Sequence, residues 1–398
     1  ALYGPITAQL SAQMVEPQVK FKEIEAIAVD KNDDGTYRID MGENYTGFFE
    51  MDFYNGVEGD SILFEISDQL GQTSSWNQKS KFIYGKSGEG KFKNRFNVAG
   101  GRWITVYGLK YKPKIEDVKG FVITNNRKQI SKFESSNGQL NQIYQINLNT
   151  YLANTMDGIL VDCPHRERVG YGDGQTAMDL GCYNFDASTL YTKWSDNWWD
   201  EQKEDGLVPF VAPTPHLTGG GPAWGAMSIV VPWKTYLFYG DLKHLEKGYP
   251  FMRKYIEYLE QHSENGILKD AFPGEKWHNL GDWGPPGKGM DKTEWVDDHS
   301  RRFFNNCYRA YLLQIMIKVG SLVGETEDVK VFEQELNHLQ EAVHSKWYNA
   351  KDSSYANGEQ PYLIFPLKTG ITPVELREAL FEKFVHTMLV KDKGHLNT

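Results

Sequence analysis

The residues best suited to chemistry lie in one short segment, "VDCPHRERVGYGDGQ", from Val161 to Gln175. It contains three carboxylates, Asp162, Glu167 and Asp173. Splitting a glycosidic bond needs one carboxylic acid to protonate the leaving oxygen and a second carboxylate to activate water or to attack. The same acidic and basic side chains could instead form ion pairs that only hold a loop in place. The residue types alone leave both interpretations open.

Two further loops combine aromatic rings with polar or flexible backbone. "GGGPAWG" places Trp224 at the start of an expected helix, and "NLGDWGPPG" places Asp282 beside Trp283. Tryptophan rings can pack against the C–H faces of sugars, and they also fill protein cores. Since 14% of the residues are aromatic, composition does not choose between the two roles. Three such loops in one region favour a carbohydrate site.

Several other chemistries lack their motifs. The sequence has no GxSxG, GxxxxGK[ST] or HExxH segment and no paired CxxC. Its three cysteines, Cys163, Cys182 and Cys307, fit neither a zinc site nor a disulfide framework. We therefore expect no metal and no cofactor.

The charge balance restricts the partners. A net charge of −10 disfavours nucleic acid and anionic membrane surfaces, which need a basic face. No segment approaches the roughly 20 apolar residues of a membrane span. A neutral ligand is the expected partner. The oligomeric state stays open, and so does the location, with secretion or the periplasm favoured over the cytoplasm.

Two patterns divide the chain, whose 398 residues exceed the usual size of a single core. Short alternating segments between about 19 and 124, such as "TYRIDM" and "WITVYGLKY", predict an antiparallel β-sandwich domain over residues 19–130. Residues 1–18 would be the tail of a missing upstream domain. Apolar residues then recur at helical spacing, which predicts an all-α domain over 131–398.

The expected helices are separated by unusually long loops. A first helix runs from about 140 to 152, capped by Ser136 or Asn137. We expect the others at roughly 175–203, 223–239, 249–262, 299–323, 326–347 and 373–389, with Pro250 and Pro373 in first turns. The loops at about 203–223 and 262–299 are longer than those of a simple helical bundle. They favour a toroid of paired helices around a central cavity. A closed ring of six pairs needs more helices, so we expect the rest beyond Thr398.

The segment "DCPHRERVGYGDGQ" resembles the signature DCPQRDERLGWTGDAQ of the α-L-rhamnosidases of glycoside hydrolase family 78. "YRIDMGENYTGFFEMDF" and "GRWITVYG" resemble β-domain phrases of that family, and "FESSNGQLNQIY" resembles the entry to its catalytic domain. "PAWG" and "GDW" resemble its downstream loops. The resemblance spans nearly the whole chain. It implies β-sandwich domains before an (α/α)6 barrel, and inverting, exo-acting removal of terminal α-L-rhamnose.

The resemblance also implies residue roles. Glu167 falls on the general acid, and Asp162 and Asp173 fall on residues that hold rhamnose hydroxyls. The further substrate-binding positions are Arg166, Tyr171, Trp224, Asp282 and Trp283. This sequence departs from the common signature in three ways, one of which is that "GYGDGQ" is one residue shorter than GWTGDAQ. Asp162 and Glu167 are one residue closer together, and Tyr171 replaces Trp.

The general base of the family lies in a segment resembling GATTIWE, which does not occur here. "GHLNT" resembles the phrase that precedes the missing helices, so we expect the base beyond Thr398 and this chain to carry half of the catalytic pair. Two alternatives remain. One is a carbohydrate-binding relative that lacks the base, and the other is a different (α/α) glycosidase or lyase.

Overall fold

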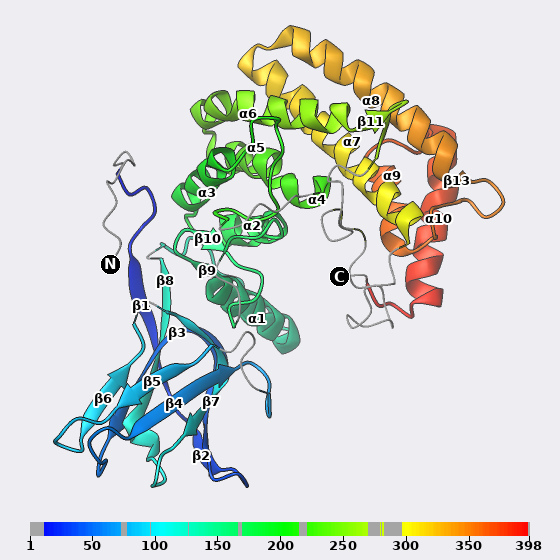
Figure 1. Cartoon of the computed structure of the whole chain (residues 1–398). Helices are drawn as coiled ribbons and strands as arrows, with labels where there is room; N and C mark the ends of the chain where they lie inside the picture. The colour runs from blue at the N-terminus through cyan, green and yellow to red at the C-terminus, as the bar shows by residue number, and fades with distance from the viewer. Residues whose placement is uncertain are drawn as a thin grey trace. The chain divides into compact units, whose positions relative to one another are not determined.

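The computed structural model describes residues 12–72, 78–95, 97–125, 127–165, 169–214, 221–269, 279, 281 and 297–396. The chain divides into two compact units. The first unit comprises Ala1–Gly170 and Ala177–Lys193, and the second comprises Tyr171–Thr176 and Trp194–Thr398. Figure 1 colours the strands of the first unit blue to cyan and the later helices green to red.

Antiparallel strands form the sheet of the first unit. They are β1 (Gln18–Glu25), β2 (Ala28–Lys31), β3 (Tyr37–Phe53), β4 (Ser61–Ser67), β5 (Ser80–Ile83), β6 (Gly90–Lys93), β7 (Ala99–Tyr107) and β8 (Val118–Asn125), with a 3-10 turn, η2 (Ile115–Asp117), before the last. The hydrogen-bonded order is β1-β8-β3-β7-β4-β5, and β2 and β6 also pair with β3. All neighbours whose register is described run antiparallel, as predicted.

The long strand β3 organises this sheet. Its alternating residues Tyr37, Ile39 and Met41 are buried, as the period of a strand requires. The register of β3 against β7 shifts between Asp40 and Tyr45, so the strand bulges there. Beyond the bulge, β3 leaves β7 and pairs with β8 and β6. One strand therefore serves both parts of the sheet.

The sheet curls around an aromatic core. Phe64 of β4 stacks on Phe92 of β6 with ring centroids 4.7 Å apart, although β4 and β6 are not sheet neighbours. Phe53 of β3 stacks on Phe82 of β5 at 4.5 Å. The sequence predicts a two-layer sandwich. The antiparallel strands are confirmed, and they are linked in one curled sheet because β3 pairs with β7 at one end and with β8 and β6 at the other.

The helices begin with α1 (Gly138–Asn154), which contacts β3 and β8 in the first unit. Asn137 caps it, as predicted, by accepting hydrogen bonds from the backbone N–H groups of Gln139 and Leu140. The later helices are α2 (Gly174–Asn184), α3 (Ser188–Asp200), α4 (Pro222–Gly225), α5 (Met227–Tyr239), α6 (Leu242–Gln261), α7 (Asp298–Val323), α8 (Thr326–Trp347), α9 (Gln360–Lys368) and α10 (Arg377–His386). A 3-10 turn, η4 (Val374–Leu376), precedes α10, and a π-helical turn, η5 (Thr387–Lys391), follows it.

Three short hairpins each follow a helix. They are β9 (Thr155–Met156) with β10 (Ile159–Leu160), β11 (Ser263–Glu264) with β12 (Ile267–Leu268), and β13 (Tyr348–Asn349) with β14 (Ser354–Tyr355). In the second unit, α5, α6, α7 and α8 contact one another in chain order, and α9 contacts α10. Figure 1 shows α7 and α8 running side by side. Successive helices from α5 to α8 are thus neighbours in space.

Helix α7 lies at the centre of the second unit. It contacts α4, α5, α6, α8 and α9. Asp297 caps it by accepting a hydrogen bond of 2.8 Å from the backbone N–H of Ser300. The fully buried guanidinium of Arg309 donates to Glu260 of α6 and to Glu335 of α8. An ionic cluster therefore joins three helices.

Three expectations about the helices were wrong. The stretch 175–203 is two helices with a break at 185–187, and α9 was not predicted. Pro250 does not start a helix but lies inside α6, which begins after Asp241. The apolar face formed by Leu245, Tyr249 and Met252 continues past the exposed Pro250. Burial of that face outweighs the local cost of the proline.

Candidate active site

The segment from Asp162 to His165 lies in the first unit, directly after the β9–β10 hairpin. Asp162 is exposed, and its Oδ2 accepts a hydrogen bond of 3.1 Å from the Cys163 thiol. A Cβ atom on Gly100 of β7 would lie 2.6 Å from the carbonyl carbon of Pro164. Only glycine at position 100 lets the segment approach β7 this closely. The His165 Nδ1 lies 3.5 Å from Asp68 Oδ2, which holds the other end of the segment.

A cavity of about 420 Å³ adjoins this segment, and all of its lining residues belong to the first unit. They come from the β3 bulge, the end of β4, β7, α1 and the Asp162 segment: Glu43, Asn44, Tyr45, Thr46, Asp68, Gly100, Gly101, Ile146, Asn149, Thr150, Ala153, Asn154, Asp162, Cys163, Pro164 and His165. Several of these residues are exposed, so the cavity opens to solvent. Outside the segment Asp162–His165, sequence reasoning did not single out these residues, because they come from parts of the chain far apart in the sequence.

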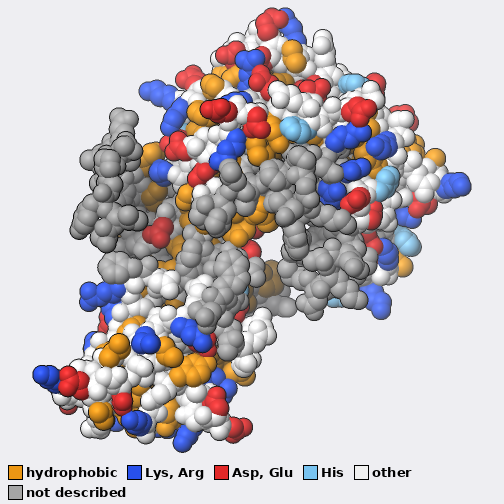
Figure 2. Space-filling model, in the orientation of Figure 1, with side chains coloured by type: hydrophobic (Ala, Val, Ile, Leu, Met, Phe, Trp, Pro, Cys, Tyr) orange, Lys and Arg blue, Asp and Glu red, His pale blue; other side chains and the backbone are white. Residues whose placement is uncertain are grey.

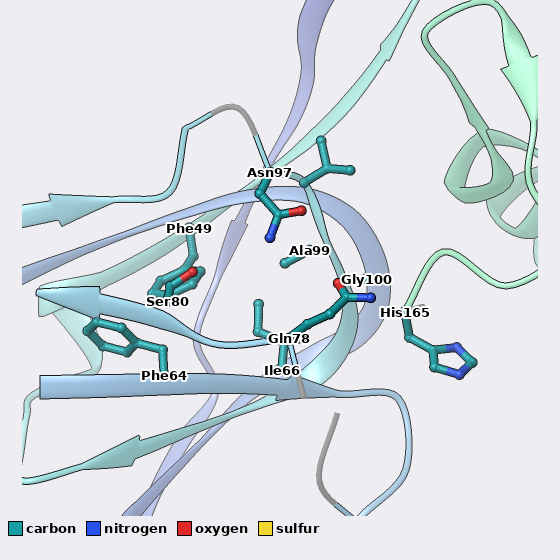
Figure 3. Close-up of a pocket in the computed structure, with 10 residues that line it drawn as sticks. Phe49, Phe64, Ile66, Gln78, Ser80, Asn97, Ala99, Gly100 and His165 are labelled. Carbon is teal, nitrogen blue, oxygen red and sulfur yellow. The ribbon is translucent and has the colours of Figure 1, made fainter. Parts of the chain in front are cut away.

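A second, much smaller pocket lies where the sheet meets His165. Gln78, Asn97 and Gly100 line it together with core residues such as Phe49 and Phe64. Figure 3 shows the His165 ring turned away from those two phenylalanines. The volume of this pocket is about 20 Å³, which has room for about one water molecule. This pocket is too small for a substrate.

In the second unit, the structure brings together two of the predicted site residues. The rings of Tyr171 and Trp224 meet edge to face, with centroids 5.6 Å apart and an interplanar angle of 87°. Phe210 joins them, with its ring 5.0 Å from Trp224 and 6.4 Å from Tyr171. Tyr171 is placed by an antiparallel bridge to Val211. The three rings form an aromatic cluster of a kind that can contact a sugar ring.

The backbone around Tyr171 is fastened to helix α4. The side-chain amide of Gln175 donates to the carbonyl oxygens of Ala223, at 2.5 Å, and of Gly172, at 3.2 Å. A Cβ atom on Gly172 would lie 2.5 Å from Trp224 Cβ. The glycine turn and the tryptophan are therefore packed directly against each other. Sequence reasoning did not assign Gln175 this role.

Asp173, a predicted sugar ligand, is partly buried in the second unit. Its backbone carbonyl accepts hydrogen bonds of 2.8 and 2.7 Å from the N–H and hydroxyl of Thr176. Burial raises the pKa of Tyr308 on α7 to about 12, and the charges of Tyr311 and Asp173 add to the effect. Sequence reasoning did not single out that tyrosine, because a helical aromatic stripe usually belongs to the core.

Four predicted site residues lie outside the described residues. They are Arg166, Glu167, Asp282 and Trp283. Of the others, Asp162 lies in the first unit, and Tyr171, Asp173 and Trp224 lie in the second.

The described part of the chain shows no group of three or more His, Cys, Asp or Glu side chains placed to hold a metal ion. Among the same residues, no helix has the length and apolar character needed to cross a bilayer. On the face seen in Figure 2, Lys and Arg are interspersed with Asp and Glu.

Two family models together match most of the chain. Residues 30–124 match the bacterial alpha-L-rhamnosidase concanavalin-like domain. Residues 128–398 match the bacterial alpha-L-rhamnosidase 6 hairpin glycosidase domain. Both describe parts of one class of protein, a glycosidase with a β domain before a helical one. The chain belongs to the bacterial alpha-L-rhamnosidase family.

Curated relatives carry the same name. An alpha-L-rhamnosidase of Formosa agariphila is 26% identical over 432 residues, covering 99% of this chain and 43% of the relative. One from Streptomyces avermitilis is 26% identical over 404 residues, covering 99% of this chain and 37% of the relative. The chain thus spans less than half the length of these relatives.

Solved structures share the fold. The alpha-L-rhamnosidase of Dictyoglumus thermophilum superposes with a TM-score of 0.88 at 25% identity, covering 100% of this chain and 45% of that one. The Streptomyces avermitilis alpha-L-rhamnosidase complexed with L-rhamnose superposes with a TM-score of 0.83 at 23% identity, covering 96% of this chain and 36% of that one. The curled β domain followed by a helical domain is therefore the arrangement of rhamnosidase structures.

Proposed function

We propose that the full-length protein is an exo-acting α-L-rhamnosidase that removes terminal α-L-rhamnose from oligosaccharides, polysaccharides or glycosides with inversion. Membership of the bacterial alpha-L-rhamnosidase family over both parts of the chain carries this proposal. The signature "DCPHRERVGYGDGQ" supports it. The partner is a rhamnose-bearing carbohydrate, and the proposal needs no cofactor.

We assign the general acid to Glu167 and substrate binding to Asp162, Arg166, Tyr171, Asp173, Trp224, Asp282 and Trp283. The carboxylates of Asp162 and Asp173 would accept hydrogen bonds from rhamnose hydroxyls. The aromatic cluster of Tyr171, Phe210 and Trp224 offers ring edges and faces to the C–H groups of the sugar. Glu167 would donate its proton to the glycosidic oxygen as the bond to rhamnose breaks.

Inversion requires a second carboxylate. It must lie roughly 6.5–9.5 Å from the acid, with a water molecule between the two, so that the water attacks the sugar from the opposite face. We assign no residue of this chain to that base. The complete reaction is therefore a property proposed for the full-length protein.

The proposed domain arrangement follows the same family. Residues 19–130 would form the β domain, and residues 131–398 would form part of a catalytic (α/α)6 barrel. The chain-order contacts of α5, α6, α7 and α8 support such a ring of paired helices. The name of the matching family model, which specifies six hairpins, supports it as well.

The test is the Glu167→Gln variant of the full-length protein. Loss of a general acid typically costs about 10²- to 10⁴-fold in rate. We expect kcat to fall by that order on alkyl α-L-rhamnosides, and by much less on the 2,4-dinitrophenyl rhamnoside, because an acidic phenol departs without being protonated. Glu341→Gln, at an exposed position of α8, is the control and should behave as the wild type.

The outcomes separate the alternatives. If kcat fell equally on the alkyl and the 2,4-dinitrophenyl rhamnoside, Glu167 would not be the general acid. A full-length wild-type protein that binds L-rhamnose in calorimetry and hydrolyses no rhamnoside would be a carbohydrate-binding relative. Hydrolysis of other nitrophenyl glycosides in place of the rhamnoside would point to a different glycosidase.

A further inference from the structure

The open cavity of the first unit has the size of a small-molecule site. Its volume of about 420 Å³ falls within the ~300–1,000 Å³ typical of ligand pockets. It lies beside Asp162, one of the residues proposed to bind rhamnose. The proposed reaction at the glycosidic bond assigns no role to this cavity.

The cavity is built from several segments that the fold brings together. The bulge of β3 takes Glu43 and Asn44 out of the paired register with β7 and presents them to the cavity. Helix α1 contributes residues spaced three and four apart, including Ile146, Asn149 and Ala153, which share one helix face. Bulges beside functional sites commonly direct side chains in this way.

Thr46, in the wall of the cavity, carries a buried hydroxyl group. The side chain of Thr46 is 1% exposed, and its hydroxyl has no hydrogen-bond partner among the residues that the structure describes. Leaving a buried hydroxyl without a hydrogen bond is unfavourable. Thr46 lines the cavity, so a polar ligand or ordered water there could satisfy this group.

The chemistry of the wall favours a neutral, hydroxyl-rich ligand. The carboxylates of Asp68 and Asp162 accept hydrogen bonds and disfavour an anion. The described part of the chain shows no set of three side chains placed to hold a metal ion. Asn149 can donate as well as accept, and the exposed Ile146 offers apolar surface. A sugar ring combines these features, since it carries hydroxyls at its rim and C–H groups on its faces.

We propose that this cavity binds the sugar unit to which the terminal rhamnose is attached, so that the β domain and α1 select the leaving group. The inference rests on the proposed function, because Asp162 would hold rhamnose at the edge of the same cavity. The leaving sugar would place hydroxyls against Asn149 and Thr46.

Two substitutions test the proposal in the full-length protein. Thr46→Val removes the hydroxyl and keeps the shape of the side chain, so the fold should be at least as stable. Asn149→Leu changes an exposed position of α1. Asn147→Leu is the matched control, because Asn147 is exposed on the same helix and does not line the cavity.

The measurement is kcat/KM on two kinds of substrate, an aryl α-L-rhamnoside and a panel of α-L-rhamnosyl-D-glucose disaccharides that differ in linkage. For Thr46→Val and Asn149→Leu, we expect the loss on at least one disaccharide to exceed the loss on the aryl rhamnoside by about tenfold. The control should match the wild type on both. Equal losses on both substrates, or no loss, would overturn the proposal and leave the rhamnosidase function intact.

A binding assay separates the two proposals. Cys163 lines the cavity and is partly exposed, whereas Cys182 and Cys307 are buried, so a thiol reagent should modify Cys163 first. In Glu167→Gln, the disaccharide should slow this modification more than L-rhamnose alone does. Equal protection by both sugars, or none, would overturn the cavity proposal. A wild-type protein that hydrolyses no rhamnoside but shows the selective protection would overturn the function and keep the sugar site.

Discussion

Gly172 and Trp224 are packed so closely that no side chain fits between them. A Cβ atom at position 172 would lie 2.5 Å from Trp224 Cβ and 2.7 Å from its Cα. Trp224 also contacts the rings of Tyr171 and Phe210. The position of the tryptophan therefore depends on the absence of a side chain at position 172.

This contact predicts the effect of Gly172→Ala. The added methyl group must displace Trp224 or the turn, at a cost of about 1–3 kcal/mol for overpacking. We expect a lower melting temperature and a raised KM for an aryl rhamnoside. The control is Gly138→Ala at the start of α1, where a Cβ meets nothing within 4 Å. Wild-type KM in Gly172→Ala would show that Trp224 does not contact the substrate.

Gly100 has the corresponding role in the first unit. Gly100→Ala should push the Asp162–His165 segment away from β7, because the new Cβ would lie 2.6 Å from Pro164. We expect at least about a tenfold fall in kcat/KM and a changed rate of Cys163 modification by a thiol reagent. Gly85→Ala, where a Cβ has open space, should change neither. Unaltered thiol reactivity in Gly100→Ala would show that the segment tolerates the methyl group.

The ion pair of Asp40 and Arg102 predicts a pH dependence of stability. Arg102 donates two hydrogen bonds of 2.7 and 2.8 Å to Asp40, which hold the pKa of that carboxyl below its ordinary value. The stabilisation is complete above the unfolded pKa, about 3.9, and is lost as the pH falls through the folded pKa. The Asp40→Asn substitution should lower the free energy of unfolding by about 1 kcal/mol at pH 7.

Urea unfolding at several pH values checks this prediction. The stability difference between the wild type and Asp40→Asn should shrink once the pH drops below about 4. Asp33→Asn, at an exposed position of the same domain, should show no difference at any pH. A gap that stays constant on acidification would mean that the charge of Asp40 contributes nothing to stability.

The cluster around Arg309 predicts a large loss of stability. Its side chain is 0% exposed and bridges Glu260, which is 54% exposed, and Glu335, which is 14% exposed. Arg309→Met leaves the Glu335 carboxylate buried without its cation, which typically costs about 3–5 kcal/mol. Glu260→Gln should cost about 1 kcal/mol or less, since that side chain is half in solvent. Chemical denaturation measures both. If both variants lost a similar amount of unfolding free energy, the difference in burial between Glu260 and Glu335 would not determine the stability.

Much of the fold could be read from short-range patterns. The alternation of Tyr37, Ile39 and Met41 predicts a strand, and Asn137 predicts the start of α1. What could not be read depends on distant contacts. No local signal shows that β3 continues from β7 to β8, or that α6 runs through Pro250, because burial against other segments decides both.

The candidate site was predictable in part for the same reason. Tyr171 and Trp224 stand in loops of distinctive composition, and the structure brings their rings together. Tyr308 resembles any core aromatic on a helix, so the influence of the Asp173 charge on its pKa was not foreseen. The cavity beside Asp162 combines residues as far apart as Thr46 and Asn149, which no sequence motif links.

The pairing of β1 with β8 also affects how the protein is made. Gln18 of β1 pairs with Asn125 of β8, so β1 is completed by the last strand of this sheet to be synthesised. At about 5–20 residues per second, translation of the intervening strands takes many seconds. During that time β1 lacks its hydrogen-bonding neighbour, and such a waiting strand invites aggregation. Chaperone binding to the nascent chain would therefore matter most before β8 emerges.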